Sequence, residues 1–412
     1  MTETSTLRRL RVLLSAYACE PGKGSEPGTG WHMAMELAKR YDVTVLTRAN
    51  DRGPIEKELA ESTGPRPTFL YHDLSGLYRF LKKRRILPTQ LYYAMWQRDT
   101  RRMLETKSVS DFDIFHHITF NSFEISPGVP AGFRGALVRG PLGGGQTAPP
   151  ALLESLGWLD KLKEQARSAR VRKSAASSRL QRDLAACDLI LHANHETGDL
   201  LKQGQENRRD PMIDVGVDPS KFSPADHAKD GTRILSASNF EPRKGTRLLL
   251  LAFQRAHQDN PSLRLLLAGS GKLLAQDMAW VEANRLSNSV SFLGKLDHQK
   301  MADELSAADV FVFPSLRDTS GAIVLEAMAC GLPIVCLDHQ GAKVMVGDCC
   351  GMRISPESLE GTLDGIARAI LKLASNVSLR ESMGHRARER VLAEFSWEKK
   401  ASRLSEEYQR LV

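Results

Sequence analysis

The stretch DVFVFPSLRDTSGAIVLE, residues 309–326, decides the fold that we expect for this chain. Residues 310–313 are apolar and form a strand pattern that ends at Pro314, because proline has no N–H to donate to a sheet. A polar loop, 315–321, follows, and then an apolar helical pattern begins. A strand, a tight loop and a helix start in this order leave free backbone N–H groups that can bind an anion.

Two carboxylates flank this loop, since Asp318 lies within it and Glu326 lies about one turn into the helix. Carboxylates accept hydrogen bonds from hydroxyl groups, whereas phosphates need N–H donors. A ligand that carries both groups, such as a sugar nucleotide, therefore fits the pattern, and Ser320 and Gly321 are candidates for its phosphate contacts. The alternative is that both acids are solvated residues at a helix start, where the helix dipole favours them.

Short apolar segments alternate with helical patterns along the chain, which indicates parallel sheets with helices on both faces. The expected strands of the first half lie near residues 11–16, 43–47, 68–72, 113–117, 136–139 and 189–193. Those of the second half lie near residues 234–237, 263–268, 289–293, 310–313 and 334–337. Residues 215–232 have no periodicity and are expected to be the linker. Ligands of such sheets bind at the carboxyl ends of the strands, so two facing sheets would hold a donor and an acceptor across a cleft.

Length and composition limit the class of protein. A chain of 412 residues is expected to form two domains with separate cores. The six cysteines lack metal-ligand spacing, and several lie in apolar patterns, as is typical of a reduced cytosolic protein. The N-terminus has no signal-peptide pattern, and no apolar run is long enough to span a bilayer. We therefore expect a cytoplasmic protein, either soluble or peripheral on the inner face of the cell membrane.

The net charge of +8 is concentrated in the first half of the chain. Residues 79–102 contain eight basic residues and one acidic residue, and residues 161–182 have the same counts. The first of these stretches also contains Tyr92, Tyr93 and Trp96. Basic and aromatic residues together suit an anionic membrane surface, although a charge run is more often a solvated helix face. We expect no nucleic-acid partner.

The residues around the two carboxylates resemble a known family. Asp318-x7-Glu326, followed by AMACGLPIVCLDHQG, is similar to the acidic motif of glycosyltransferase family 4, which comprises retaining enzymes of the GT-B fold. The family usually has glutamate at the first position, where this chain has aspartate. The resemblance implies that Glu326 binds the ribose hydroxyls of a nucleotide and that Asp318 binds hydroxyls of the donor sugar.

Two glycine-rich loops of the first half resemble one bacterial branch of the same family. CEPGKGSEPGTGW, residues 19–31, follows the first strand, and its Gly28 and Gly30 would allow a ligand to approach the helix start closely. RGPLGGGQ, residues 139–146, follows a later strand, and the resemblance places it on the acceptor side of the cleft. Neither loop has the Gly-Lys-Ser/Thr ending of a P-loop, and a flexible surface turn is the alternative for each.

The segment SASNFEPRKGTRLLLLAF, residues 236–253, supplies the expected cations. Lys244 matches the lysine of the family's Lys-Gly pair, and with Arg243 it would stabilise a departing diphosphate without a metal ion. The family usually has an arginine five residues before this lysine, where this chain has Asn239. Gly269, in the loop after the next strand pattern, is expected to contact the nucleotide.

The segment DFDIFHHIT, residues 111–119, has two possible functions. Asp111-x-Asp113 imitates the metal-binding motif of the other large glycosyltransferase fold, but it precedes a strand, and a plain turn explains such short matches more often. His116 and His117 lie at the carboxyl end of that strand, where the family places a histidine near the donor sugar, and His116 fits best. The alternative is a strand-end histidine bonded to backbone. We expect no metal ion and no other cofactor.

These patterns and the resemblance predict an α/β protein of GT-B architecture with two doubly wound Rossmann-like domains that face a cleft. The expected parts are an N-terminal acceptor-side domain (1–220), a C-terminal nucleotide-sugar domain (221–394) and a terminal helix (395–412) that crosses back to the first domain. The resemblance implies a retaining, metal-independent hexosyltransferase. This enzyme would move a sugar from a nucleoside diphosphate sugar to a hydroxyl of a glycan or lipid-linked acceptor, with His116, Lys244 and Asp318 in catalytic roles.

Two alternatives come from other classes of protein. Sugar-nucleotide 2-epimerases share the GT-B fold and need no acceptor. A catalytically degenerate protein that binds a membrane surface or nucleic acid would account for the basic stretches at 79–102 and 161–182.

Overall fold

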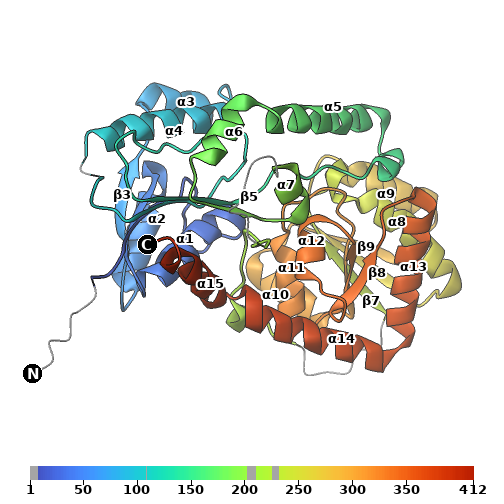
Figure 1. Ribbon diagram of the computed structural model, residues 1–412. Helices are drawn as coiled ribbons and strands as arrows, with labels where there is room; N and C mark the ends of the chain where they lie inside the picture. Colours follow the sequence, from blue (N-terminus) through green and yellow to red (C-terminus); the bar gives the residue numbers. More distant parts are fainter. Residues whose placement is uncertain (1–7, 108, 202–209, 225–231) are drawn as a thin grey trace, which may run out of the picture.

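The structure is a computed structural model that describes residues 8–107, 109–201, 210–224 and 232–412. It forms two lobes, each built on a six-stranded sheet with helices on both faces (Figure 1). The strand orders are β3-β2-β1-β4-β5-β6 in the first lobe and β12-β11-β10-β7-β8-β9 in the second. Neighbouring strands are parallel in both sheets.

The strands of the first lobe are β1 (Arg11–Ser15), β2 (Asp42–Arg48), β3 (Thr68–His72), β4 (Ile114–His117), β5 (Ala136–Leu142) and β6 (Leu189–His192). Those of the second lobe are β7 (Arg233–Ala237), β8 (Arg264–Ala268), β9 (Val290–Gly294), β10 (Val310–Phe313), β11 (Ile334–Leu337) and β12 (Gly351–Ile354). A strand forms at each segment where we expected one. The sequence analysis missed only β12, a short edge strand whose residues are mostly half-buried and so lack a clear apolar pattern.

The helices of the first lobe are α1 (Ser25–Ala38), α2 (Arg52–Glu61), α3 (Gly76–Lys83), α4 (Thr89–Glu105), α5 (Trp158–Ala175), α6 (Ser178–Ala185) and α7 (His195–Leu200). Those of the second are α8 (Thr246–Asp259), α9 (Leu274–Ala283), α10 (His298–Ala307), α11 (Ala322–Ala329), α12 (Gln340–Met345), α13 (Leu359–Ser375) and α14 (Val377–Arg390). In the described part of the chain, the helices are all too short or too polar to cross a bilayer.

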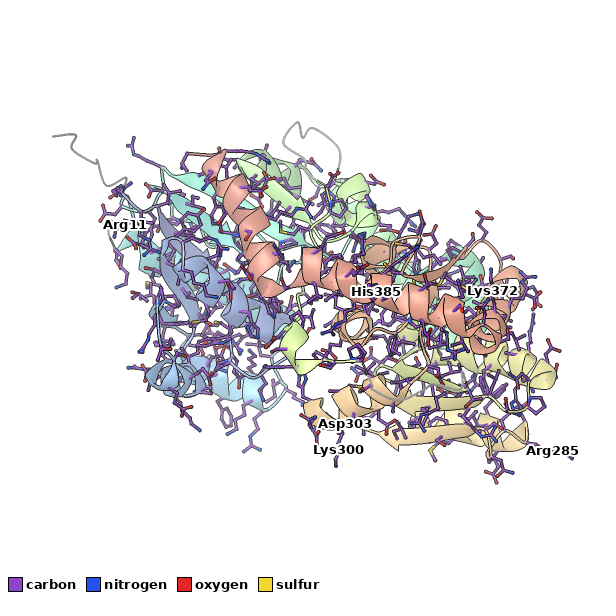
Figure 2. The ribbon with its side chains drawn as sticks, turned by 90° about the horizontal axis from the view of Figure 1, so that it is seen from below. Arg11, Arg285, Lys300, Asp303, Lys372 and His385 are labelled. Carbon is purple, nitrogen blue, oxygen red and sulfur yellow. The ribbon has the colours of Figure 1, made fainter. Side chains whose placement is uncertain are left out.

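The last helix, α15 (Trp397–Gln409), leaves the second lobe and packs against α1 of the first (Figures 1 and 2). It begins at Ser396, whose side chain accepts a hydrogen bond from the backbone N–H of Lys399. Ala401, Leu404 and Tyr408 are buried in the core of the first lobe. The crossing of this helix back to the first lobe, which we expected from the resemblance, is confirmed.

The aromatic residues of the first basic stretch lie in the core. Tyr92, Tyr93 and Trp96 of α4 are almost fully buried and belong to the same apolar cluster as residues of β1 and β2. The expectation that they could form a membrane-facing layer is therefore wrong, because they pack against the sheet. Residues 215–224 of the expected linker are described, and there Val217 and Phe222 pack into the second-lobe core; residues 225–231 lie outside the described ranges.

Candidate functional site

A cavity of about 610 Å³, the central cavity, lies at the carboxyl ends of the second-lobe strands and borders the first lobe. It is lined by residues that follow β7, β8, β9 and β10, as expected for a parallel sheet. Six of the predicted site residues line it together: Arg243, Lys244, Gly269, Asp318, Ser320 and Gly321.

Lys244 is held beside the loop that follows β10. The next residue, Gly245, has a φ of 71°, and a Cβ there would lie 2.0 Å from the carbonyl oxygen of Pro314, so only glycine allows this close approach. The Lys244 ammonium forms an ion pair with the carboxylate of Asp318. An ammonium has three N–H donors, so Lys244 can also bind an anionic ligand in the cavity.

Asp318 orients its neighbours. One carboxylate oxygen bonds Lys244, and the other accepts the backbone N–H of Thr319 at 3.0 Å. The backbone N–H of Asp318 in turn donates to the side-chain oxygen of Gln340 at 2.8 Å. Because both carboxylate oxygens already have partners, Asp318 positions the Lys244 ammonium and can bind a sugar hydroxyl only by sharing its oxygens.

Further cations surround the same cavity. Arg243 donates from Nε to the Glu241 carboxylate at 2.9 Å and lines the cavity beside Asn239. Lys295, directly after β9, also lines it. The sequence analysis missed Lys295 because it is a single exposed lysine in a short loop, without a motif around it.

The start of α11 faces the central cavity. Ala322 and Ile323, its first residues, line the cavity, and the N–H groups of a first helical turn have no partner within the helix. The positive end of the helix dipole therefore points to the same space as the Lys244 ammonium. Ser320, just before the helix, donates its hydroxyl proton to Asp214. Backbone N–H groups and fixed cations together form a site for an anion.

Glu326 lines an adjoining cavity of about 560 Å³, which shares Ser25, Val215 and Ala322 with the central cavity. Burial raises the pKa of Glu326 to about 7. Glu326 is half-buried at the wall of this cavity, so its carboxylate can accept a hydrogen bond from a ligand hydroxyl.

The two predicted glycines of the first loop have different surroundings. Gly28 lines the adjoining cavity, where a Cβ would lie 2.2 Å from the carbonyl oxygen of Lys23. Gly30 does not line the central or the adjoining cavity, and a Cβ there would lie 2.2 Å from the carbonyl oxygen of Ala18. The contact role that we expected for Gly30 is wrong, since this glycine lets α1 pack closely on the chain after β1.

His116 lies in the core of the first lobe. Its side chain is fully buried, and its ring nitrogens bond the Tyr408 hydroxyl at 2.6 Å and the Gly140 carbonyl oxygen at 2.8 Å. Burial lowers the pKa of His116 to about 4, so the ring is neutral. His117 is equally buried and bonds Tyr93 and Ser15. The structure therefore does not bring His116 to the cavities, and our placement of it beside the donor sugar is corrected.

Asp111 and Asp113 directly precede β4 and lie at the amino ends of the central strands of the first sheet. Asp113 accepts the backbone N–H of Arg11 at 2.7 Å, and Asp111 lies 3.3 Å from the Arg11 guanidinium. Figure 2 shows Arg11 at the side of the first lobe that faces away from the second. These aspartates tie β4 to β1, which agrees with their interpretation as a turn.

A third cavity, of about 310 Å³, lies on the first-lobe side, and we call it the first-lobe cavity. Gly143 and Gly144 line it, so the loop at residues 139–146 borders this space. Glu26 and Asp214 line both this cavity and the central one. Burial and the nearby Asp214 raise the pKa of Glu26 to about 7. Sequence reasoning missed Glu26, although it stands within the quoted GSEPG motif, because only the glycines of that motif were considered.

The loop after β10 also joins the lobes. Thr319 accepts hydrogen bonds from Gln146 at 2.8 Å and from Asn194 at 3.0 Å, both in the first lobe. Arg317 forms two hydrogen bonds of 2.8 Å to Glu164 of α5. The loop that carries Asp318 is therefore fixed to the first lobe as well as to the second. These bonds fix the position of the two lobes on either side of the cavities.

Comparisons with known proteins agree with this geometry. Residues 218–390 match the family described as Glycosyl transferases group 1. This part of the chain is therefore similar to the glycosyl transferases group 1 family. It contains every second-lobe residue that we placed around the central and adjoining cavities.

Curated relatives match about half of the chain. The GDP-mannose-dependent monoacylated alpha-(1-6)-phosphatidylinositol monomannoside mannosyltransferase of Corynebacterium glutamicum is 31% identical over 210 residues, which cover 46% of this chain and 53% of that protein. The D-inositol 3-phosphate glycosyltransferase of Geodermatophilus obscurus is 29% identical over 223 residues, which cover 50% of this chain and 48% of that protein. The chain thus spans about half the length of these relatives.

Solved structures match nearly the whole chain. Sucrose-phosphate synthase from Thermosynechococcus elongatus has a TM-score of 0.64 at 18% identity, covering 98% of this chain and 99% of that one. HepE from Anabaena, in complex with UDP and glucose, has a TM-score of 0.60 at 16% identity, covering 98% and 100%. These likenesses concern the fold alone, and they confirm the GT-B architecture.

Proposed function

We propose that this protein is a retaining glycosyltransferase, which moves a sugar from a nucleoside diphosphate sugar to a hydroxyl of an acceptor. The observation that carries the proposal is one cavity in which Lys244, Arg243 and the start of α11 face the same space. The carboxylate of Glu326 lies in the cavity next to it. Cations and N–H groups suit a diphosphate, and the carboxylate suits ribose hydroxyls.

The chemistry follows from the positions of these charges. Breaking the bond between the anomeric carbon and the diphosphate leaves negative charge on the leaving group, which Lys244, Arg243 and the α11 N–H groups stabilise. The acceptor hydroxyl attacks from the face that the diphosphate leaves, so the anomeric configuration is retained. This route needs no nucleophile from the protein, and Asp318 contributes by orienting Lys244.

The relatives suggest classes of donor and acceptor. One is named a GDP-mannose-dependent mannosyltransferase that acts on a phosphatidylinositol mannoside, and another is named a D-inositol 3-phosphate glycosyltransferase. The fold neighbour HepE binds UDP and glucose. We therefore propose a hexose donor and a role in glycan or glycolipid synthesis.

A transfer assay tests this proposal. The protein is incubated with GDP-mannose or UDP-glucose, with and without a mixture of sugar and glycolipid acceptors, and the released nucleoside diphosphate and the products are measured. We expect release that depends on the acceptor and a new glycosidic bond of unchanged anomeric configuration. An epimerised sugar nucleotide in the absence of acceptor would instead support the epimerase, and inverted products would overturn retention.

Metal independence is a separate prediction. Because Lys244 and Arg243 supply positive charge at the expected diphosphate position, we expect sugar transfer to continue after treatment with EDTA. Transfer rates before and after chelation, and after manganese is added back, provide the measurement. Loss of transfer that manganese restores would show that the leaving group needs a metal ion.

We also propose that α3 attaches the protein to an anionic membrane. Leu77 and Phe80 of this helix and Ile86 just after it are exposed by 64%, 53% and 66%. Residues 76–86 contain no acid, and Arg79 and Lys83 are among their exposed basic residues. Exposed apolar side chains beside cations suit the surface of an anionic bilayer, where each cation contributes about 1 kcal/mol. Figure 1 shows α3 on the outer side of the first lobe.

Sedimentation with anionic liposomes tests this attachment. We expect the protein to pellet with phosphatidylglycerol vesicles at low salt and much less at high salt, because salt screens the charges. The double substitution Phe80→Ser and Ile86→Ser should reduce pelleting, whereas Val377→Ser, an exposed apolar residue of the second lobe, should not. Equal recovery in the supernatant with and without vesicles at low salt would rule the attachment out.

A further inference from the structure

The first-lobe cavity has features that the proposed donor chemistry does not use. Glu26 and Asp214 lie where this cavity meets the central cavity, since they line both. Asn121, only 7% exposed, lines the first-lobe cavity, and its amide nitrogen and oxygen find no hydrogen-bond partner among the described residues. A buried amide without partners is costly, and a ligand that bonds it would offset that cost.

The backbone on both sides of this junction is strained. Ser25, directly before Glu26, has a φ of 55°, and Phe120, directly before Asn121, has a φ of 59°. Residues other than glycine rarely adopt a left-handed conformation, and they do so mostly where function requires it. The backbone of Phe120 hydrogen-bonds the Glu26 carboxylate. The segments at Ser25 and at Phe120 therefore both fix the position of this carboxylate.

The far side of the cavity is basic. Arg167 and Arg170 of α5 line it. Arg167 donates to the carbonyl oxygens of Gln146 and Gly144, at 2.8 and 3.0 Å, and thereby fixes the loop at residues 139–146. Arg170 is mostly exposed and forms an ion pair with Glu124 at 3.6 Å through its Nε. The guanidinium has further N–H donors, which can bind an anion at the mouth of the cavity.

We infer that the first-lobe cavity binds an acceptor with several hydroxyls and one anionic group, in which Glu26 takes the proton of the attacking hydroxyl and Arg170 binds the anion. In this step the hydroxyl proton passes to the Glu26 carboxylate and the acceptor oxygen forms a bond to the anomeric carbon. The bond to the diphosphate breaks, and its electron pair leaves with the diphosphate. Asn121 bonds further hydroxyls of the acceptor. This inference rests on the proposed function.

The surroundings of Glu26 suit a base that works near neutral pH. Its pKa of about 7 is raised by burial and by Asp214, and a base is most effective when its pKa lies near the working pH. Beyond Asp214, the charged or titratable groups around this junction come from three sides. Tyr93, Asp318 and Lys400 lie beside it, and Arg243, Lys244 and Lys295 line the central cavity. Across the first-lobe cavity lie Glu124, Arg167, Arg170 and Arg317. Transfer is therefore expected to rise with pH through about 7, as Glu26 loses its proton.

The test of Glu26 separates donor binding from transfer. For Glu26→Gln we expect kcat at saturating donor to fall about 10²- to 10⁴-fold and the pH dependence of this kcat near 7 to disappear, whereas nucleoside diphosphate affinity by calorimetry stays within about twofold of wild type. Glu20→Gln, in the same loop, is the control and should behave like wild type. Near wild-type transfer by Glu26→Gln would overturn the inference, whereas absence of donor binding in the wild type would overturn the proposed function instead.

Pairs of neutral and anionic acceptors test whether Arg170 binds an anionic group of the acceptor. We compare glucose with glucose 6-phosphate and with glucuronic acid, and we include phosphatidylglycerol micelles to distinguish a lipid headgroup from a free anion. At least one anionic acceptor should have a kcat/KM more than about tenfold above that of glucose. Arg170→Ala should remove this preference, and Arg172→Ala, two residues along α5, should keep it. Equal use of neutral and anionic acceptors by the wild type, or a preference that survives Arg170→Ala, would contradict the assignment.

Discussion

Replacing Lys244 by alanine is expected to lower kcat/KM for sugar transfer by about 30- to 1,000-fold, which corresponds to about 2–4 kcal/mol of transition-state stabilisation. The ammonium lies in the central cavity, held by Asp318 and placed by the tight turn at Gly245. Negative charge grows on the diphosphate as the sugar leaves, so a fixed cation there lowers the barrier more than it improves ground-state binding. Steady-state release of nucleoside diphosphate provides the measurement.

A matched control separates this effect from general charge loss. Lys300→Ala removes an exposed lysine of α10, which Figure 2 shows on the surface, and should leave transfer unchanged. The melting temperature of Lys244→Ala must also be measured, because the substitution leaves Asp318 without its ion pair. A folded Lys244→Ala protein with wild-type kcat/KM would show that the essential cation lies elsewhere in the site.

Replacing Glu326 by glutamine should weaken binding of the nucleotide itself. Hydrogen bonds to a charged group contribute about 1.5–3 kcal/mol, so we expect a loss of about 10- to 150-fold in affinity for both the free nucleotide and the nucleotide sugar. Asp318→Asn should differ, since Asp318 borders the expected sugar position and an asparagine amide oxygen can still accept from Lys244: it should weaken the nucleotide sugar more than the free nucleotide. Calorimetry with both ligands and both variants tests this division, and equal losses throughout would refute it.

Glu326 should also make nucleotide binding depend on pH. Burial raises the pKa of Glu326 to about 7, so lowering the pH below about 7 protonates this carboxylate and weakens it as an acceptor for ribose hydroxyls. Nucleotide affinity of the wild type should therefore fall as the pH is lowered from about 8 to about 6. The part of this decrease that is absent in Glu326→Gln belongs to Glu326. An identical pH profile in both proteins would contradict this assignment.

The parts of the site that sequence reasoning found lie in loops directly after strands. Lys244 follows β7 and Asp318 follows β10, and these strands are neighbours in the second sheet, so their carboxyl ends meet. The apolar runs that mark the strands are local signals, and a parallel sheet turns them into a prediction of proximity. For this reason the sheets and six of the residues that line the central cavity could be predicted from the sequence.

The sequence-based predictions failed for residues whose surroundings come from distant parts of the chain. His116 stands at a strand end like the predicted residues that line the central cavity, but its partner Tyr408 comes from α15, 292 residues further along the chain. A strand pattern does not show which strand-end side chains turn into the core. Likewise, the basic and aromatic composition of residues 79–102 did not show that Trp96 of α4 is buried. Glu26 was missed because its importance comes from Asp214 and Asn121, which only the folded lobes bring into the same cavity wall.

The central claim is that the cavity around Lys244 binds a nucleoside diphosphate. A thermal-shift titration with UDP, GDP, ADP and their sugar conjugates tests it most directly, because a ligand that binds only the folded protein raises stability with the logarithm of its concentration. We predict that at least one of these nucleotides raises the melting temperature of the wild type in this manner, and raises that of Lys244→Ala much less. No shift with any of them at millimolar concentration, or an equal shift in both proteins, would contradict the account.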